Sequence, residues 1–230
     1  MDNTSIWDKT WLQKKNIKID EMSIEIYRYL QRYVDFDKKS VLELGCGAGR
    51  LSFLIAQNAI QKMILVDSSS RALERARSLL GKRSNITFVK SDLFQLDLSE
   101  KFDIVISSGV IEHFKKERLK ECIKKHIQFS KENVILIAPS SPHWNDFRVR
   151  MKSTLAVYGW QAPISKRQIR EIINQTDSKV VVLKRFSPLY GLPKDFVKIL
   201  KAVGIYKVIS TILRPLERSI GGLLFVKIET

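Results

Sequence analysis

Short apolar runs alternate with amphipathic segments along most of the chain. The runs expected to form strands cover residues 40–44, 63–66, 86–89, 102–106, 134–137, 179–183 and 223–228. Several segments between them place apolar residues on one side at helical spacing, as Leu73, Ala76 and Leu80 do. Strands that are apolar on both faces and joined by helices are typical of a parallel sheet covered on each side. The pattern therefore predicts an α/β fold.

The pattern changes in two later parts of the chain. Residues 140–163 contain several aromatic side chains with weak periodicity, and residues 188–222 contain an apolar and basic helical pattern interrupted at Gly204 and Pro215. A connection between two strands needs fewer residues than either part contains. We expect a single domain over residues 1–230, with helical cap insertions after the fifth and sixth strands.

The composition indicates the compartment of the protein and the charge of its binding partners. No apolar run reaches the roughly 18 residues that span a bilayer, and Cys46 and Cys122 are the only cysteines. These features favour a cytoplasmic protein in a reducing compartment. The formal net charge of +16 indicates an anionic partner such as RNA, an acidic lipid surface or a phosphorylated substrate, unless the surface is basic without a specific partner.

One turn carries most of the chemical information. Residues 45–50, which read Gly-Cys-Gly-Ala-Gly-Arg, join the first expected strand to its helix. Glycine at alternate positions lets a ligand lie against the backbone, and the start of the following helix offers free N–H groups. A dinucleotide fingerprint would need glycine at position 50, where this chain has Arg50. A dehydrogenase of similar fold is therefore disfavoured.

Glu43 and the Gly-x-Gly-x-Gly turn after it resemble motif I of the class I S-adenosylmethionine-dependent methyltransferases. The resemblance covers residues 38–140 well and 165–228 in outline. It implies S-adenosylmethionine as the cofactor and a Rossmann-like sheet of seven strands, mostly parallel, with the last strand antiparallel. In this family an acidic residue in the place of Asp67 accepts both ribose hydroxyls, and one in the place of Asp92 lies beside the adenine amino group. The residues that the resemblance assigns to the cofactor are Glu43, Gly45, Cys46, Gly47, Gly49, Asp67, Ser68, Asp92, Leu93 and Ser108.

Glu112 and His113 follow the fourth expected strand, whose end faces the transferred methyl group in this family. A histidine ordinarily titrates near neutrality, so we expect His113 to act as the base with Glu112 beside it; a packing role is the alternative. The pair also resembles part of the Glu-x-x-Glu-His metal motif of quinone O-methyltransferases and small-RNA 2′-O-methyltransferases. Gly109 stands at the first glutamate position. We therefore expect no metal, although His143 could supply another ligand.

Two classes of acceptor stay open on the sequence, with a non-catalytic binding module as a third alternative. The first is a hydroxyl or amine of a small or lipid-linked molecule, and the second is RNA methylated on a 2′-hydroxyl. Residues 107–110 read Ser-Ser-Gly-Val where enzymes that methylate base amines carry an Asp/Asn-Pro-Pro-Tyr/Phe motif, so a base amine is disfavoured. We expect His143, Trp144 and Trp160 to contact the acceptor, because residues 140–163 follow the fifth strand on the ligand edge.

Residues 194–220 combine an apolar stripe with lysine and arginine. A basic amphipathic helix of this kind can lie on an anionic membrane. The stripe can also cover the domain's own sheet or a partner subunit, and the interruptions at Gly204 and Pro215 favour short helices packed on the protein itself. We expect a helical cap beside the active site, with contact to an anionic membrane as a secondary role. The oligomeric state does not follow from the sequence.

Overall fold

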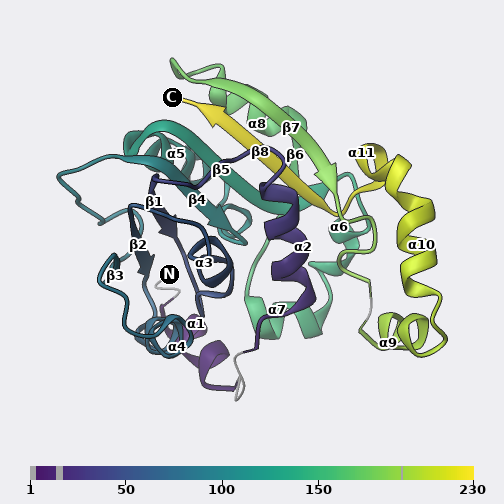
Figure 1. Ribbon diagram of the computed structural model, residues 1–230. Helices are drawn as coiled ribbons and strands as arrows, with labels where there is room; N and C mark the ends of the chain where they lie inside the picture. The colour runs from purple at the N-terminus through teal and green to yellow at the C-terminus, as the bar shows by residue number, and fades with distance from the viewer. Residues whose placement is uncertain (1–3, 14–17, 193) are drawn as a thin grey trace.

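A mostly parallel sheet forms the centre of the computed structural model, which describes residues 4–13, 18–192 and 194–230 (Figure 1). Its strands are β1 (Ser40–Leu44), β2 (Lys62–Asp67), β3 (Ile86–Lys90), β4 (Phe102–Ser108), β5 (Ser130–Ser141), β6 (Ile164–Ser165), β7 (Lys179–Phe186) and β8 (Leu223–Glu229). The main path runs β3-β2-β1-β4-β5-β8-β7, and the two-residue β6 pairs with β5 beside it. β8 is antiparallel to β5 and β7, whereas the remaining pairs are parallel. The predicted sheet, with its antiparallel last strand, is confirmed.

Helices cover both faces of this sheet. The helical segments are α1 (Thr4–Gln13), α2 (Glu21–Leu30), α3 (Arg50–Ile55), α4 (Ser70–Leu80), η1 (Ile111–His113), α5 (Lys116–Gln128), α6 (Asn145–Arg148), α7 (Lys152–Tyr158), α8 (Lys166–Ile173), α9 (Lys194–Ala202), α10 (Tyr206–Leu213), η2 (Arg214–Leu216) and α11 (Glu217–Ile220). One core contains apolar residues of α2, α3 and α4, and the other contains those of α5 and α8. Successive residues of a strand serve opposite cores: Val41 belongs to the first and Leu42 to the second.

Side-chain caps fix the starts of several helices as the sequence indicates. Asp20 accepts a hydrogen bond from the Ser23 amide at the start of α2, and Ser165 forms a capping box with Gln168 at the start of α8. β5 extends beyond the apolar run 134–137 that predicted it, because its pairing with β8 continues to Pro139 opposite Leu223. Pairing with a neighbour thus lengthens the strand past the apolar residues that identify it.

Three groups of helices lie outside the layers that cover the sheet. α6 and α7 belong to residues 140–163, and α9 to α11 belong to residues 188–222; Figure 1 shows α9 to α11 at one side of the molecule, next to the ends of β7 and β8. α1 was not expected from the sequence, and it packs beside α4 and α7. No described helix is long and apolar enough to cross a membrane.

Candidate active site

The glycine turn leaves β1 at the edge of the sheet where β2 also ends. The amides of Gly45 and Cys46 both donate to the carbonyl oxygen of Val66, at 2.8 and 3.0 Å. Oδ2 of Asp67 accepts from the Gly47 amide at 2.8 Å, and its Oδ1 accepts from the Ser69 amide at 2.9 Å. Burial raises the pKa of Asp67, and the two amide hydrogen bonds oppose that shift. The last residue of β2 therefore braces the turn after β1.

Two glycines of this turn have geometries that other residues adopt poorly. Gly47 and Gly49 have φ values of +54° and +72°, in the left-handed region. A Cβ atom on Gly47 would lie 2.8 Å from Cζ2 of Trp11, and one on Gly49 would lie 2.7 Å from Cδ1 of Leu80. Because Gly49 has no side chain, α4 can pack against the turn. Because Gly47 has none, another group can lie directly on the outer side of the turn. In this structure Trp11 of α1 is that group.

Glu43 lies at the floor of the turn and is 2% exposed. The Ser52 hydroxyl of α3 donates to its Oε2. The pKa of Glu43 is raised to about 8, because burial and the nearby Asp67 carboxylate raise it by more than the Ser52 hydrogen bond lowers it. A carboxyl group buried among apolar residues is costly unless polar partners stabilise it, so this position is built for a polar contact rather than for packing.

α1 lies across this edge of the sheet and reaches three of its parts. The Asp8 side chain accepts a hydrogen bond from the Ser69 hydroxyl, and the Trp7 ring meets the His113 ring edge-on, with centroids 4.9 Å apart. The Thr10 hydroxyl donates to the carbonyl oxygen of Val157 on α7 at 2.7 Å. No expectation from the sequence included Trp7, Asp8 or Thr10. The i, i+4 spacing of Trp7 and Trp11 is the signal that would have revealed an amphipathic helix.

The remaining predicted cofactor residues lie along the same edge. Asp92 is exposed and its Oδ1 accepts from the Phe94 amide at 2.8 Å, while Leu93 is half-buried against the second core. The Ser91 amide donates to the Asp67 carbonyl oxygen at 3.2 Å, which holds the turn after β3 next to the end of β2. Cys46 is buried, and Ser68 and Ser108 are half-buried at the ends of β2 and β4.

Glu112 and His113 form the short helix η1 after β4, and their environments differ. Oε2 of Glu112 is buried and has no hydrogen-bond partner among the described residues, and burial raises the pKa of this carboxyl to about 7. Nδ1 of His113 donates to the Trp160 carbonyl oxygen at 3.1 Å, and burial lowers the pKa of His113 to about 4. Glu112 is therefore the group that titrates near neutrality, whereas His113 is a neutral and weakly basic imidazole.

Residues 140–163 lie against η1, and in addition to the expected Trp144 they bring Arg148, a donor that sequence reasoning missed. The Ala162 amide donates to the Glu112 carbonyl oxygen at 2.8 Å. Nε1 of Trp144 and Nη2 of Arg148 are buried and have no partner among the described residues, and the positive charge of Arg148 lowers the pKa of Glu112. A Cβ atom on Gly191 would lie 3.2 Å from that Trp144 nitrogen and 3.0 Å from Nε of Arg148, so both side chains lie beside the loop after β7. We call Glu112, Trp144 and Arg148 the polar cluster.

The other predicted acceptor contacts lie at the margin of this cluster. Trp160 is 42% exposed, and Lys115 lies over its ring, 4.8 Å from the centroid. His143 packs at the start of β8, where a Cβ atom on Gly222 would lie 2.9 Å from its Cε1. Nδ1 of His143 accepts from the Asn145 amide at 3.2 Å. Within the described part of the chain, no group of three His, Cys, Asp or Glu residues is placed to hold a metal ion.

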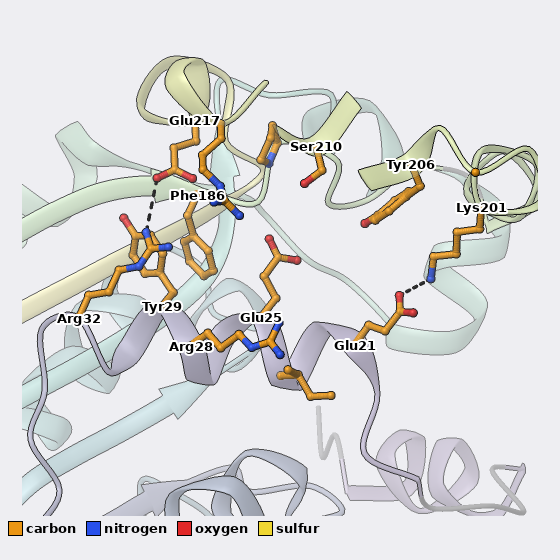
Figure 2. A pocket seen from close by; sticks show the side chains of 14 residues that line it. Glu21, Glu25, Arg28, Tyr29, Arg32, Phe186, Lys201, Tyr206, Ser210 and Glu217 are labelled. Atoms are coloured by element: carbon orange, nitrogen blue, oxygen red, sulfur yellow. Dashed lines mark hydrogen bonds and ion pairs between the residues drawn. The ribbon is translucent and has the colours of Figure 1, made fainter. Parts of the chain in front are cut away.

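A hollow lies away from the glycine turn, between α2 and the helices α9 to α11 (Figure 2). Its volume is about 820 Å³. Charged side chains of both signs line it, and Figure 2 shows Glu25 of α2 pointing toward the side that carries Ser210 and Glu217, while Arg28 lies along α2. Ion pairs join the two walls, from Lys201 to Glu21 and from Arg32 to Glu217. None of the residues that the glycine motif predicts for the cofactor lines this hollow.

Comparisons with known proteins show the family of the chain. Residues 35–180 match the family described as "Methyltransferase domain". Over 126 residues the chain is 29% identical to Nodulation protein S of Bradyrhizobium diazoefficiens, which covers 53% of this chain and 57% of that protein. The chain therefore spans little more than half the length of this relative, and smaller shares of the other sequence relatives.

Two solved structures share the fold over nearly the whole chain. The N-methyltransferase NodS from Bradyrhizobium japonicum WM9, in complex with S-adenosyl-L-homocysteine, superposes with a TM-score of 0.67 at 13% identity and covers 100% of this chain and 99% of its own. The magnesium protoporphyrin IX methyltransferase from Synechocystis PCC 6803, with the same product bound, has a TM-score of 0.63 at 16% identity and covers 98% and 92%.

The fold and the glycine turn define a Rossmann-like domain, and the family that matches it is one of methyltransferases. The chain belongs to the methyltransferase-domain family, and the predicted class of S-adenosylmethionine-dependent methyltransferases is confirmed together with its cofactor. The residues present fit this cofactor: the glycines at the positive-φ positions of the turn carry no side chains of their own that would block a ligand, and the acidic Glu43 and Asp67 lie beneath and beside the turn. When bound, S-adenosylmethionine supplies a methyl group activated by a positively charged sulfur.

Proposed function

We propose that this methyltransferase acts on a hydroxyl or amine of a small or lipid-linked molecule, bound at the polar cluster beside the end of β4. The observation that carries the proposal is the buried Oε2 of Glu112, which has no hydrogen-bond partner among the described residues. Buried polar atoms nearly always have a partner, so an atom without one at this edge suits the polar hydrogen of an acceptor. Trp144 and Arg148 offer two further unused donors for other polar atoms of that molecule.

The chain's own groups suffice for the proton transfer. The acceptor's O–H or N–H donates to the Glu112 carboxylate, which positions the lone pair of the acceptor atom toward the methyl group. With S-adenosylmethionine bound, Glu112 would take up the acceptor's proton as the new bond to the methyl carbon forms, and the electron pair of the broken carbon–sulfur bond would stay with the sulfur. A pKa of about 7 for Glu112 suits a base of this kind near neutral pH. His113 then orients the site through its contacts with Trp7 and Trp160.

Relatives support a small acceptor. One solved structure of the same fold is named as an N-methyltransferase, and the other is named for the methylation of magnesium protoporphyrin IX, a small molecule. Glu112 also lies 4% exposed beneath residues 140–163, a position that a compact functional group reaches more readily than the ribose of a folded RNA.

Labelled methyl groups test the proposal. The protein is incubated with methyl-labelled S-adenosylmethionine and, in separate reactions, with a small-molecule and lipid extract of the source cells and with their total RNA. We expect label in the extract, with turnover lost in Glu112→Gln and retained in Glu117→Gln, which changes an exposed glutamate on α5. Label in RNA alone, or full turnover by Glu112→Gln, would contradict the proposal.

A further inference from the structure

The helices α9 to α11 expose an apolar surface that the sequence led us to expect buried. Their exposed large apolar residues are Phe196 (49%), Ile199 (59%), Val203 (59%), Ile205 (43%), Val208 (55%), Ile212 (66%), Leu216 (53%) and Ile220 (39%). We call these eight residues, which include Val203 and Ile205 between α9 and α10, the outer stripe. A contiguous exposed apolar patch on a protein marks an interaction site more often than it marks chance.

The outer stripe is one side of helices that are apolar on both sides. Within α9, Leu200 is only 5% exposed and packs inward, whereas Ile199 next to it points outward. The spacings of Phe196, Ile199 and Val203, and of Val208 and Ile212, follow the i, i+3, i+4 and i+7 pattern of one helix face. A helix that needs apolar residues only to pack on its own domain would have a polar outer face.

The charge around the stripe identifies its partner. Residues 194–220 contain Lys194, Lys198, Lys201, Lys207, Arg214 and Arg218 against Asp195 and Glu217, and of these Lys201, Arg214 and Glu217 line the hollow on the inner side. Lys198 and Arg218 are exposed on the same helices. Burial lowers the pKa of Lys166, and the positive charges of Arg185, Arg170 and Arg218 lower it further, which shows that cations gather where α11 meets the domain.

This combination favours one partner over two others. A second copy of the chain would bring two surfaces together that each belong to a protein of net charge +16, so the charges oppose self-association. A nucleic acid would use the cations and leave the apolar stripe in water. A bilayer with anionic headgroups matches both features, because the stripe enters the boundary between headgroups and acyl chains while lysine and arginine meet the phosphates.

We propose that the outer stripe of α9 to α11 docks the enzyme on the surface of an anionic bilayer. Ion pairs on the inner side of these helices, from Lys201 to Glu21 and from Arg32 to Glu217, fasten the docking segment to α2. The segment leaves β7 and returns to β8 at the sheet edge that carries the polar cluster, so docking brings that edge close to the membrane.

Vesicle flotation tests the docking without any acceptor or turnover. The wild-type protein is mixed with vesicles of phosphatidylcholine alone or of phosphatidylcholine with phosphatidylserine. We expect the wild type to float with the anionic vesicles. In Val208→Glu/Ile212→Glu the floated fraction should fall by at least about tenfold, because two apolar side chains that would contact the bilayer are replaced by carboxylates. Lys198→Gln/Arg218→Gln should also weaken flotation by about tenfold or more, because each cation contributes near an anionic surface.

A matched control keeps the net charge of the first variant. Gln61→Glu/Val181→Glu adds the same two negative charges at exposed positions outside the segment, and it should float as the wild type does. Thermal melting of every variant checks that the fold is kept. The proposal is overturned if the wild type floats with neither kind of vesicle, if the control loses flotation equally, or if Val208→Glu/Ile212→Glu floats unchanged. The stripe would instead belong to self-association if the wild type does not float, forms dimers in solution, and these dimers are dissociated by Val208→Glu/Ile212→Glu.

Discussion

The Gly47 amide donates a hydrogen bond of 2.8 Å to Oδ2 of Asp67, and this contact joins the glycine turn to the end of β2. The same carboxylate holds the Ser69 amide with its other oxygen. Each oxygen keeps a second lone pair, and the prediction that Asp67 accepts the cofactor's ribose hydroxyls uses these remaining lone pairs.

Removal of the Asp67 carboxylate should therefore weaken cofactor binding. We expect Asp67→Ala to cost roughly 1.5–3 kcal/mol of affinity for S-adenosyl-L-homocysteine, as for hydrogen bonds to a charged group. Asp67→Asn, which keeps one acceptor oxygen, should cost less. Calorimetry measures both, and an intact Asp67→Ala protein with wild-type affinity would show that Asp67 does not bind the ribose.

Trp11 covers Gly47 from α1, and its removal should open the turn to solvent. We expect Trp11→Ala to weaken binding of S-adenosyl-L-homocysteine by about tenfold or more, because an apolar cover is lost. Leu12→Ala serves as the control, since Leu12 is 56% exposed on the same helix. Tighter binding by Trp11→Ala would mean that the indole competes with the cofactor rather than covering it.

Trp144 and Trp160 should differ in importance, because only the Trp144 indole nitrogen is buried in the polar cluster. We expect Trp144→Leu to lower kcat by about tenfold, the value of one oriented hydrogen bond. Trp160, which is 42% exposed and contacts His113 through its backbone, should lower turnover less when changed to leucine. Both variants should keep wild-type affinity for S-adenosyl-L-homocysteine. Wild-type turnover by both would end the assignment of residues 140–163 to the acceptor side.

The raised pKa of Glu112 predicts a pH profile. The base must be ionised, so kcat/KM should rise as the pH increases through about 7, and His113, with a pKa of about 4, stays neutral over that range. Glu112→Gln should remove the rise. A wild-type profile that is flat across neutrality would exclude Glu112 as the base.

The same shift affects folding stability with a defined sign. The pKa of Glu112 is higher in the folded protein than its ordinary 4.5, so its contribution to stability is fully present below pH 4.5 and is lost as the pH rises through about 7. Glu112→Gln should therefore gain Tm relative to the wild type at alkaline pH and gain less in acid.

The glycine turn and the sheet could be predicted from sequence because their signals are local. The spacing of Gly45, Gly47 and Gly49 and the acidic end of β2 lie within one strand–turn–helix–strand unit. The polar cluster could not be predicted in full. The positive charge of Arg148 on α6 lowers the pKa of Glu112 on η1, and no spacing along the chain encodes that approach.

For the helices α9 to α11, the sequence predicted the secondary structure but not its packing. Their apolar pattern predicted helices, which the structure has, but it did not say which side faces the domain. The expectation that the apolar face packs on the protein is wrong for Val208 and Ile212, which are 55% and 66% exposed. The cap role of residues 140–163 and 188–222, the cytoplasmic location and RNA as an alternative acceptor stay predictions.

Cofactor binding at the glycine turn is the central claim, and one calorimetric titration tests it most directly. The wild type is titrated with S-adenosyl-L-homocysteine and with NAD, and Gly47→Val is titrated in parallel. We expect micromolar-range affinity for the first ligand and none for NAD. Gly47→Val should abolish the binding, because φ is +54° at this position and a side chain there meets Trp11 and the ligand's space. Binding of NAD without binding of S-adenosyl-L-homocysteine, or undiminished binding by a folded Gly47→Val variant, would contradict the account.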